Sequence, residues 1–127
     1  MIEGEHLEGF QEAVRVVQEE LDPWESRILL LTIDDAPNPL SRARAVIRAG
    51  LGAPYAFDES FFSHIRDALG DSHEWVREAA VWATSYSPWP QYRPLLEDIA
   101  RNDPKEKIRG DAAAILAGFD QEGVGNS

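Results

Sequence analysis

Two segments of this sequence carry the same pattern, DSHEWVREAAVWA at residues 71–83 and DPKEKIRGDAAAI at residues 103–115. In each segment an aspartate comes first, a branched apolar residue and an arginine follow at Val76-Arg77 and Ile108-Arg109, and alanines come next. Corresponding residues lie 32 positions apart. A fixed period of this size is typical of stacked helical hairpins, because a single hairpin cannot bury its apolar face alone. The repeat therefore predicts a helical solenoid.

Residues around these segments resemble a HEAT repeat. Pro94-Leu95-Leu96 is followed by Asp103 and then by Ile108-Arg109. The HEAT family has a proline in its first helix, an aspartate in the turn and a Val-Arg pair early in its second helix. The copy that begins at Asp71 matches the turn and the second helix, but has Phe61-Phe62 where the proline is expected.

A weaker third copy begins at Asp35. There Leu40 stands in the branched-apolar position, 36 residues before Val76, and Ser41 replaces the arginine. Together the copies cover about residues 24–119. The resemblance implies an all-α fold, a right-handed α-α superhelix of about seven helices in antiparallel hairpins, and it implies little about a partner.

We expect one domain, residues 1–119, followed by a flexible tail, 120–127, that is rich in glycine and polar residues. The domain is expected to contain a terminal capping helix and three helical hairpins. Their predicted ranges are 5–20 for the cap and 23–50, 58–86 and 91–119 for the hairpins.

Apolar residues at helical spacing predict where each helix is buried. The first helix is amphipathic and is expected to cover one end of the stack, with glutamates on its outer face. Its apolar stripe consists of Leu7, Phe10, Val14, Val17 and Leu21. The helix over 23–33 is apolar on most sides, so we expect it to be central and well buried. The inner stripe of the helix that follows is expected to be Leu40, Ala43 and Ile47.

Composition and charge restrict the class of protein. The chain has 127 residues, no cysteine, and no apolar run approaching the ~20 residues of a membrane helix. The first residues lack the basic and apolar regions of a signal peptide, so a cytoplasmic location is the default expectation. The net charge is −11, of which residues 1–25 carry −7, whereas residues 26–50 are locally basic.

This acidity opposes binding to nucleic acid, whose affinity comes from lysine and arginine displacing counterions. It favours a basic protein or peptide as partner, with a monomer or a weak homo-oligomer as the resting state. The alternative interpretation is that the carboxylates only keep a small protein soluble.

Catalytic and metal-binding patterns are weak. The three histidines have no His-x-x-x-His spacing, and only His64 and His73, with Asp67 or Asp71, fall close enough in sequence to suggest a shared site. The serines lack a Gly-x-Ser-x-Gly motif, and no glycine-rich loop with a lysine is present. We therefore expect no catalytic residue, no metal and no cofactor.

The repeated charged residues have a structural interpretation. A pair that recurs with the architecture is better explained as capping each turn and linking adjacent hairpins than as acid and cation catalysis. We assign this role to Asp71, Arg77, Asp103 and Arg109, with Pro94 in the first turn of its helix.

Aromatic residues give the candidate binding site. Trp75, Trp82 and Tyr86 share one side of a helix, beside its apolar core stripe, and Trp89 follows in the next turn. Exposed Trp and Tyr side chains are frequent anchors of protein interfaces. In HEAT-like stacks the second helices commonly line the concave face, which would place Glu78 beside Trp82. The alternative is that these rings fill gaps left by alanine-rich helices.

Three functional hypotheses follow. The first is a non-catalytic interaction module that presents an acidic curved surface. The second, within the same class, is a bacterial immunity or antitoxin-like inhibitor of a basic toxin, since complementary charge speeds capture. The third rests on fold analogy alone, with HEAT-like DNA glycosylases and chromophore lyases. The glycosylases need a basic face, and here only Arg42, Arg44 and Arg48 cluster.

Overall fold

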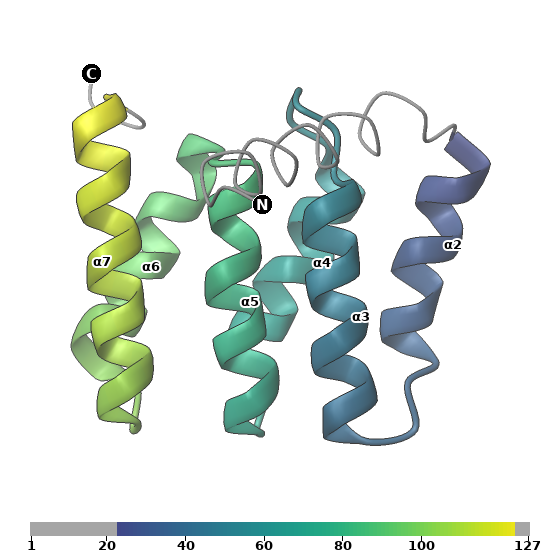
Figure 1. Ribbon diagram of the computed structural model, residues 1–127, viewed down its shortest axis with the longest axis horizontal. Coiled ribbons are helices and arrows are strands. Elements are labelled where there is room, and N and C mark those ends of the chain that lie inside the picture. The colour runs from purple at the N-terminus through teal and green to yellow at the C-terminus, as the bar shows by residue number, and fades with distance from the viewer. Residues whose placement is uncertain (1–22, 124–127) are drawn as a thin grey trace, which may run out of the picture.

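The computed structural model of the protein describes residues 23–123, with side chains from Arg27 onward. This part of the chain is all helical and contains no strand (Figure 1). Its elements are α2 (Pro23–Asp34), α3 (Pro39–Gly52), α4 (Glu59–Leu69), α5 (Glu74–Tyr86), the short 3-10 helix η1 (Pro90–Tyr92), α6 (Arg93–Asn102) and α7 (Glu106–Glu122). The helix predicted over 5–20 lies outside the described residues.

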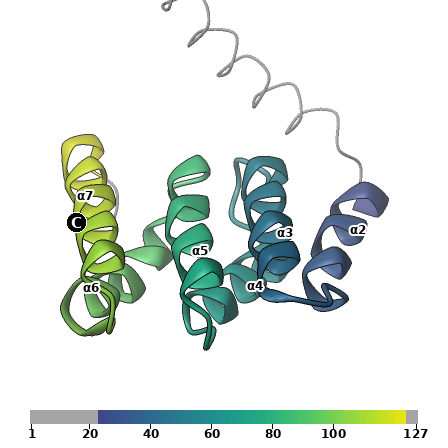
Figure 2. The ribbon, with the colours of Figure 1, turned by 60° about the horizontal axis from the view of Figure 1, so that its bottom comes forward.

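The described helices form antiparallel hairpins that stack side by side. The second helices of the hairpins, α3, α5 and α7, lie next to one another in one layer, with α4 and α6 behind them (Figures 1 and 2). The first hairpin, α2 and α3, stands at one end of the stack. The predicted all-α solenoid is confirmed for this part of the chain.

The helix boundaries follow from local chemistry. Asp58 accepts a hydrogen bond from the backbone N–H of Phe61 (3.0 Å), so it caps α4. The rings of Phe57 and Phe62 pack across this cap with their centroids 5.4 Å apart and form a hydrophobic staple. Gly70 ends the helix. In the first hairpin Asn38 caps α3 through the N–H of Ser41 (2.9 Å).

The core is built largely from small and branched residues. Val46, Val76 and Leu96 are fully buried between the two layers. Where α3 crosses α5 the backbones come very close, because Gly50 lies directly against Ala83. A Cβ atom at position 50 would lie 2.7 Å from the Cβ of Ala83 and 3.0 Å from its Cα. The absence of a side chain at Gly50 therefore sets the distance between these helices.

Two predictions about burial in the first hairpin are wrong. Leu30 and Ile33 are buried, but Ile28 is 41% and Leu31 is 49% exposed, so α2 is not a central helix of the described stack. It is the edge helix, covered by α3 and α4 on one side only. Leu40 is 47% exposed because it lies in the first turn of α3, before the stripe that faces α5. The buried positions of α3 are Ala43, Ala45, Val46, Ala49, Gly50 and Gly52.

The last helix is longer than expected. It continues through Asp120 to Glu122, so these residues do not belong to a flexible tail. Asp120 forms an ion pair with Arg93 of α6 (2.7 Å), and Gly123 ends the helix in the left-handed conformation (φ 72°). A glycine adopts this conformation without the strain that a side chain brings.

We predict that Gly50→Ala destabilises the protein. Alanine normally favours a helix over glycine, but here its methyl group overlaps the backbone and Cβ of Ala83, which are not free to rotate away. Overpacking of this kind costs about 1–3 kcal/mol of unfolding free energy. Urea denaturation of the two proteins measures the difference.

Gly110→Ala is the matched control, because a Cβ at that position in α7 meets no atom within 4 Å. It should stabilise the protein by about 0.5–1 kcal/mol, the usual helix-propensity gain. Ala83→Gly should rescue Gly50→Ala in part. If Gly50→Ala is as favourable as Gly110→Ala, the close helix crossing is wrong.

Candidate interaction surface

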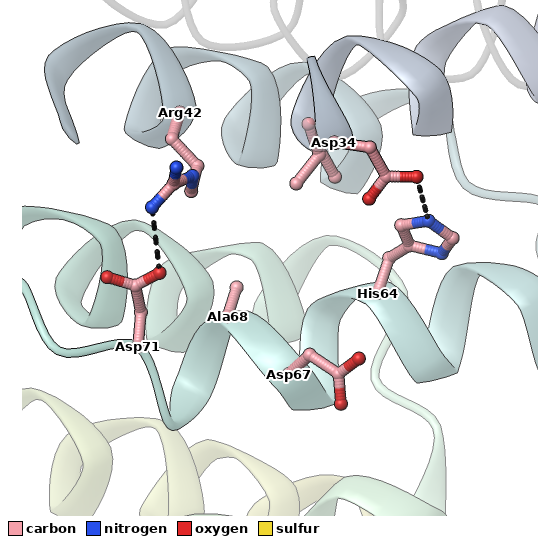
Figure 3. Close-up of a pocket in the computed structure, with 7 residues that line it drawn as sticks. Asp34, Arg42, His64, Asp67, Ala68 and Asp71 are labelled. Atoms are coloured by element: carbon pink, nitrogen blue, oxygen red, sulfur yellow. Dashed lines mark hydrogen bonds and ion pairs between the residues drawn. The ribbon is translucent and has the colours of Figure 1, made fainter. Parts of the chain in front are cut away.

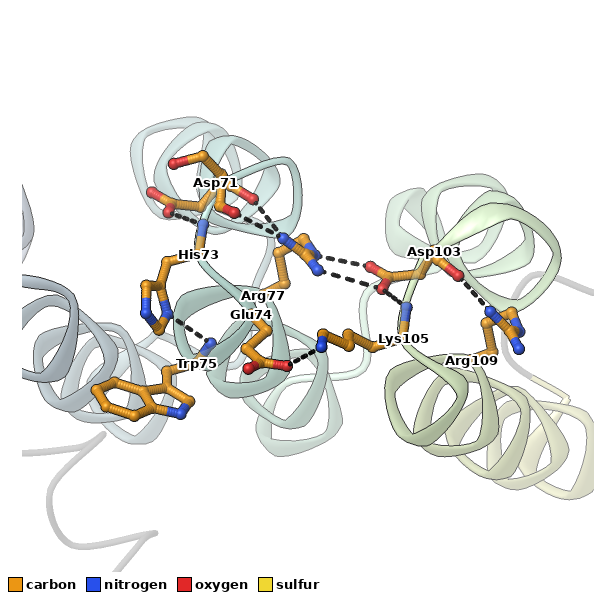
Figure 4. Close-up of polar contacts among 9 residues, drawn as sticks. Asp71, His73, Glu74, Trp75, Arg77, Asp103, Lys105 and Arg109 are labelled. Carbon is orange, nitrogen blue, oxygen red and sulfur yellow. Dashed lines mark hydrogen bonds and ion pairs between the residues drawn. The ribbon is translucent and has the colours of Figure 1, made fainter.

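Each repeated arginine closes the turn that precedes its own helix (Figure 4). The Nη1 group of Arg77 donates to the backbone carbonyls of Asp71 (3.0 Å) and Ser72 (3.1 Å). Arg109 donates in the same way to the carbonyl of Asp103 (2.6 Å). The aspartate side chains hold the other side of these turns, because the Oδ1 of Asp71 accepts the N–H of His73 (2.9 Å).

The same residues also join one hairpin to the next. The guanidinium of Arg77 binds the carboxylate of Asp103 through Nε–Oδ2 (2.8 Å) and Nη2–Oδ1 (3.4 Å). Their side chains are only 11% and 3% exposed. The Oδ1 of Asp103 also accepts the N–H of Lys105 (2.9 Å). Within residues 23–123 no buried side-chain nitrogen or oxygen lacks a hydrogen-bond partner, so this buried ion pair is compensated.

A third contact of this kind joins the first two hairpins through Arg42, which the repeat pattern did not identify. Arg42 donates to the Oδ2 of Asp71 (3.2 Å), as Arg77 does to Asp103. The repeat pattern placed the arginine of this copy at position 41, which is occupied by a serine. Arg42 follows the cap of α3, Asn38, by four residues, as Arg77 follows the cap of α5, His73, but the turn from Asp35 to Asn38 is one residue longer than the turn from Asp71 to His73. The sequence signal that could have identified this contact was an arginine one residue after the expected position.

The aromatic residues of α5 fall into two groups. Trp75 is 50% and Trp82 is 40% exposed. Tyr86 is half-buried, and its ring packs against the helix crossing at Gly50. Trp75 and Trp82 are therefore the rings of α5 that remain available to a partner.

Trp89 is a correction to the predicted site, because its side chain is only 4% exposed. Its indole Nε1 donates to the carbonyl of Tyr55 (3.0 Å). Its ring packs on Tyr92, with centroids 5.6 Å apart, and edge-on against Phe57, with centroids 5.2 Å apart. Burial also raises the pKa of the Tyr92 hydroxyl above its ordinary value. Trp89 thus joins hairpins and does not belong to a binding surface.

Glu78 is partly exposed beside the tryptophans, but it already has a partner. It binds Lys107 of α7, which also binds Asp111 (3.0 Å). The hydrogen bond to Glu78 and then the one to Asp111 raise the pKa of Lys107. This cation joins α5 to α7 on the surface, and its single positive charge is shared by two carboxylates.

The cations of α3 differ from Lys107. Arg44 and Arg48 are exposed, and neither has a hydrogen bond or an ion pair with another residue of the described chain. Both line a shallow groove against Ala79 of α5. Arg48 also lines a second groove, between α2 and α3, that contains Ile28 and Leu31. Arg48 therefore lies between the two grooves.

We define the interaction face by these two grooves and the ring-bearing side of α5. Trp75 and Trp82 flank Ala79 at spacings of four and three residues, so they lie on the side of α5 that borders the groove. The exposed apolar and charged members of the interaction face are Ile28, Leu31, Asp35, Arg44, Arg48, Trp75 and Trp82, and the buried Ala79 lines the groove between α3 and α5.

A separate polar pocket lies between α2 and α4 (Figure 3). There the ring of His64 bonds to Asp34 (Nε2–Oδ2, 3.3 Å) and to the carbonyl of Ser60 (2.8 Å). Asp67 and Asp71 also border the pocket, but His73 is used to cap α5. Among the described residues no three His, Asp or Glu side chains converge in a way that could hold a metal ion.

Comparison with known proteins identifies the class. A family model for HEAT repeats matches residues 26–117, which span most of the stacked helices. The chain therefore belongs to the HEAT repeat family. Comparison with curated proteins and with solved structures gave no significant match. None of the helices from α2 to α7 has the length and apolar character that crossing a membrane requires.

Pro94 lies in the first turn of α6, where a missing N–H costs little.

We predict that Arg77→Ala is far more destabilising than Arg109→Ala. The first substitution leaves the buried Asp103 carboxylate without its cation, which costs about 3–5 kcal/mol. The second removes a bond to one carbonyl and costs about 1 kcal/mol. Urea denaturation measures both losses.

Arg66→Ala is the control, because Arg66 forms an exposed pair with Asp67 whose side chains are 46% and 75% exposed. Exposed pairs contribute little, so its unfolding free energy should change by less than about 0.5 kcal/mol. Equal effects of Arg77→Ala and Arg66→Ala would show that the buried pair does not hold the stack together.

Proposed function

We propose that this HEAT repeat protein is a non-catalytic interaction module whose interaction face binds a protein or peptide. HEAT repeats generally serve as protein-interaction modules, and this chain belongs to that family. The observation that supports the binding site best is the combination of exposed Trp75 and Trp82 with arginines that have no partner among the described residues. Tryptophan and arginine are the residues most enriched among the anchors of protein interfaces.

The proposed face is rigid enough for this task. Its helices are held at fixed spacing by the Gly50–Ala83 crossing and by the Arg77–Asp103 pair. A partner that binds a preformed surface loses less conformational freedom than one that must order it. The exposed rings can therefore contribute their full apolar area to binding.

The charge of the partner is a separate question. Net acidity favoured a basic partner, but residues 1–25 carry −7 of the total −11, and the rest of the chain only −4. Beside the interaction face Glu78 shares Lys107 with Asp111, and on the face Asp35 is the carboxylate of one groove, whereas Arg44 and Arg48 have no acidic partner within the described chain. We therefore propose that this face binds an acidic segment, and that a basic partner, such as the toxin of an immunity protein, would bind elsewhere.

The enzymatic alternatives do not receive this kind of support. A glycosylase needs a broad basic surface for the DNA backbone, and the unpaired cations of the face are confined to α3. The polar pocket of Figure 3 contains a histidine and carboxylates that bond to groups of the protein itself. We propose that these contacts join α2 and α3 to α4 and have no catalytic role.

We predict that Trp82→Ala weakens partner binding more than it weakens folding. The tagged full-length protein is used to capture partners from its native cell, and the amount bound is compared with the unfolding free energy of each variant. A central exposed tryptophan contributes at least about 2 kcal/mol to such interfaces, so recovery should fall strongly while stability changes little.

Two controls make the result specific. Tyr55→Ala removes another exposed ring, 87% exposed but in the connection between α3 and α4, and should leave capture unchanged. Trp89→Ala should show the opposite order, with a loss of about 3–5 kcal/mol in stability. The proposal fails if Trp82→Ala behaves like Tyr55→Ala in capture.

A further inference from the structure

The charged residues of the repeat turns do not all have a partner within the described chain. Each copy of the repeat has an aspartate in its turn and an arginine in the helix that follows. These residues are Asp35 and Arg42, Asp71 and Arg77, and Asp103 and Arg109. Two pairs form, each between the arginine of one hairpin and the aspartate of the next: Arg42 with Asp71 (3.2 Å) and Arg77 with Asp103 (2.8 Å). Arg109 and Asp35 are left at opposite ends of the stack.

We infer that these two residues pair between copies of the chain, so that Arg109 of one copy binds Asp35 of the next. The occupant of each end is a second copy, and the stack of hairpins continues head to tail. This inference goes beyond the proposed function, because the second copy occupies only the groove between α2 and α3, which Asp35 lines. Trp75 and Trp82 of the interaction face lie on α5, on the far side of α3 (Figure 1).

The guanidinium of Arg109 is oriented as this contact requires. Its Nη1 donates to the carbonyl of Asp103 (2.6 Å), as the Nη1 of Arg77 donates to the carbonyl of Asp71 (3.0 Å) (Figure 4). Arg77 then uses its Nε and Nη2 to bind the carboxylate of the following hairpin. The Nε and Nη2 of Arg109 have no partner among the described residues. By the same geometry they are directed to where a further turn aspartate would lie.

The side of α7 that carries Arg109 is an open repeat interface. In α3 and α5, the residues four and seven positions after the arginine are fully buried. These residues are Val46, Ala49, Val81 and Thr84. The corresponding residues of α7 are Ala113, which is exposed, and Leu116, which is half-buried. This side of α7 therefore has the spacing of an interface without a hairpin of the described chain to cover it.

The other end of the stack supplies a carboxylate and apolar side chains. Asp35 is exposed, and its carboxylate has no hydrogen bond or ion pair with a described residue. The other two turn aspartates each accept the backbone N–H two residues further on. After Asp35 that position is Pro37, which has no N–H. Both carboxylate oxygens of Asp35 are thus available, beside the exposed Ile28 and Leu31 of the same groove.

The other charges near the two ends keep this association weak. At the receiving end Asp34 is paired with His64, but Arg44 and Arg48 of α3 are exposed and disfavour an incoming arginine. Glu106, one turn before the arginine of α7, has the opposite effect. Each copy also has a net charge of −11. Interactions beyond about 8 Å are largely screened at physiological salt, whereas a partly buried pair is screened much less. The contact should therefore be measurable at physiological salt and high protein concentration.

Charge reversal tests the pairing in the full-length protein, with the average mass measured by sedimentation equilibrium as a function of concentration. The mass should rise without levelling off at that of a dimer, because a head-to-tail contact leaves one end of each pair open. Asp35→Arg and Arg109→Asp should each lower the association constant about tenfold or more. An equimolar mixture of the two variants should restore association, because every end then meets the opposite charge.

Glu59→Arg and Arg66→Asp are the matched controls, because they make the same changes of net charge at exposed positions of α4. Neither should reduce association. Asp35→Arg lowers the net negative charge, which by itself favours association, so a loss in this variant is specific to the site. It also leaves every hydrogen bond of the described chain in place, and urea denaturation verifies that the variants are folded.

Three results would overturn the inference. A protein that stays monomeric at every soluble concentration shows that the two ends do not associate. A mass that levels off at that of a dimer shows a symmetric contact elsewhere. A mixture that associates no better than the separate variants shows that Arg109 and Asp35 do not pair. The Trp82 capture experiment can succeed or fail independently of all three.

Discussion

The structure depends on a buried ion pair between neighbouring hairpins. Arg77 binds the carboxylate of Asp103 in the next repeat and the carbonyls of its own turn, so one side chain fixes both a turn and a repeat interface. Such a pair needs full hydrogen bonding to offset the cost of desolvation. Because these bonds are available only when both turns are formed, the pair couples the folding of adjacent hairpins.

This coupling explains the arrangement of the outer surface. Hairpins held at a fixed spacing place α3 and α5 side by side, and the missing side chain of Gly50 lets them approach closely. The ring-bearing side of α5 then lies beside the arginines of α3. Neither helix alone would bring an aromatic stripe and unpaired cations to one face. The interaction face is thus a product of the stacking and not of a single motif.

Much of the fold could be predicted from the sequence, because its causes are local and periodic. The 32-residue repeat identified the turns at Asp71 and Asp103 and the helices that follow them, α5 and α7. Arg42 was missed because the turn between Asp35 and the cap of its helix is one residue longer than the turn after Asp71. The two strong copies of the repeat keep a constant spacing of 32 residues, and the first hairpin does not.

The candidate site was predicted less well, because exposure depends on neighbours distant in the sequence. Trp89 looked available, yet Tyr55 and Phe57 of the preceding connection bury it. Ile28 and Leu40 looked buried, but nothing in the described chain packs on those sides. Net charge also did not predict the charge of the interaction face, since the acidity is concentrated near the N-terminus, whereas Arg44 and Arg48 of the face have no partner among the described residues.

The most direct test of the central claim is a double-mutant cycle on the buried pair. Unfolding free energies are measured in urea for Arg77→Met, Asp103→Asn and the double variant. If the pair couples the hairpins, the two effects are strongly non-additive, with an interaction energy of about 1–3 kcal/mol. Additivity within about 0.5 kcal/mol, the behaviour of independent sites, would contradict the claim that this pair holds the repeats together.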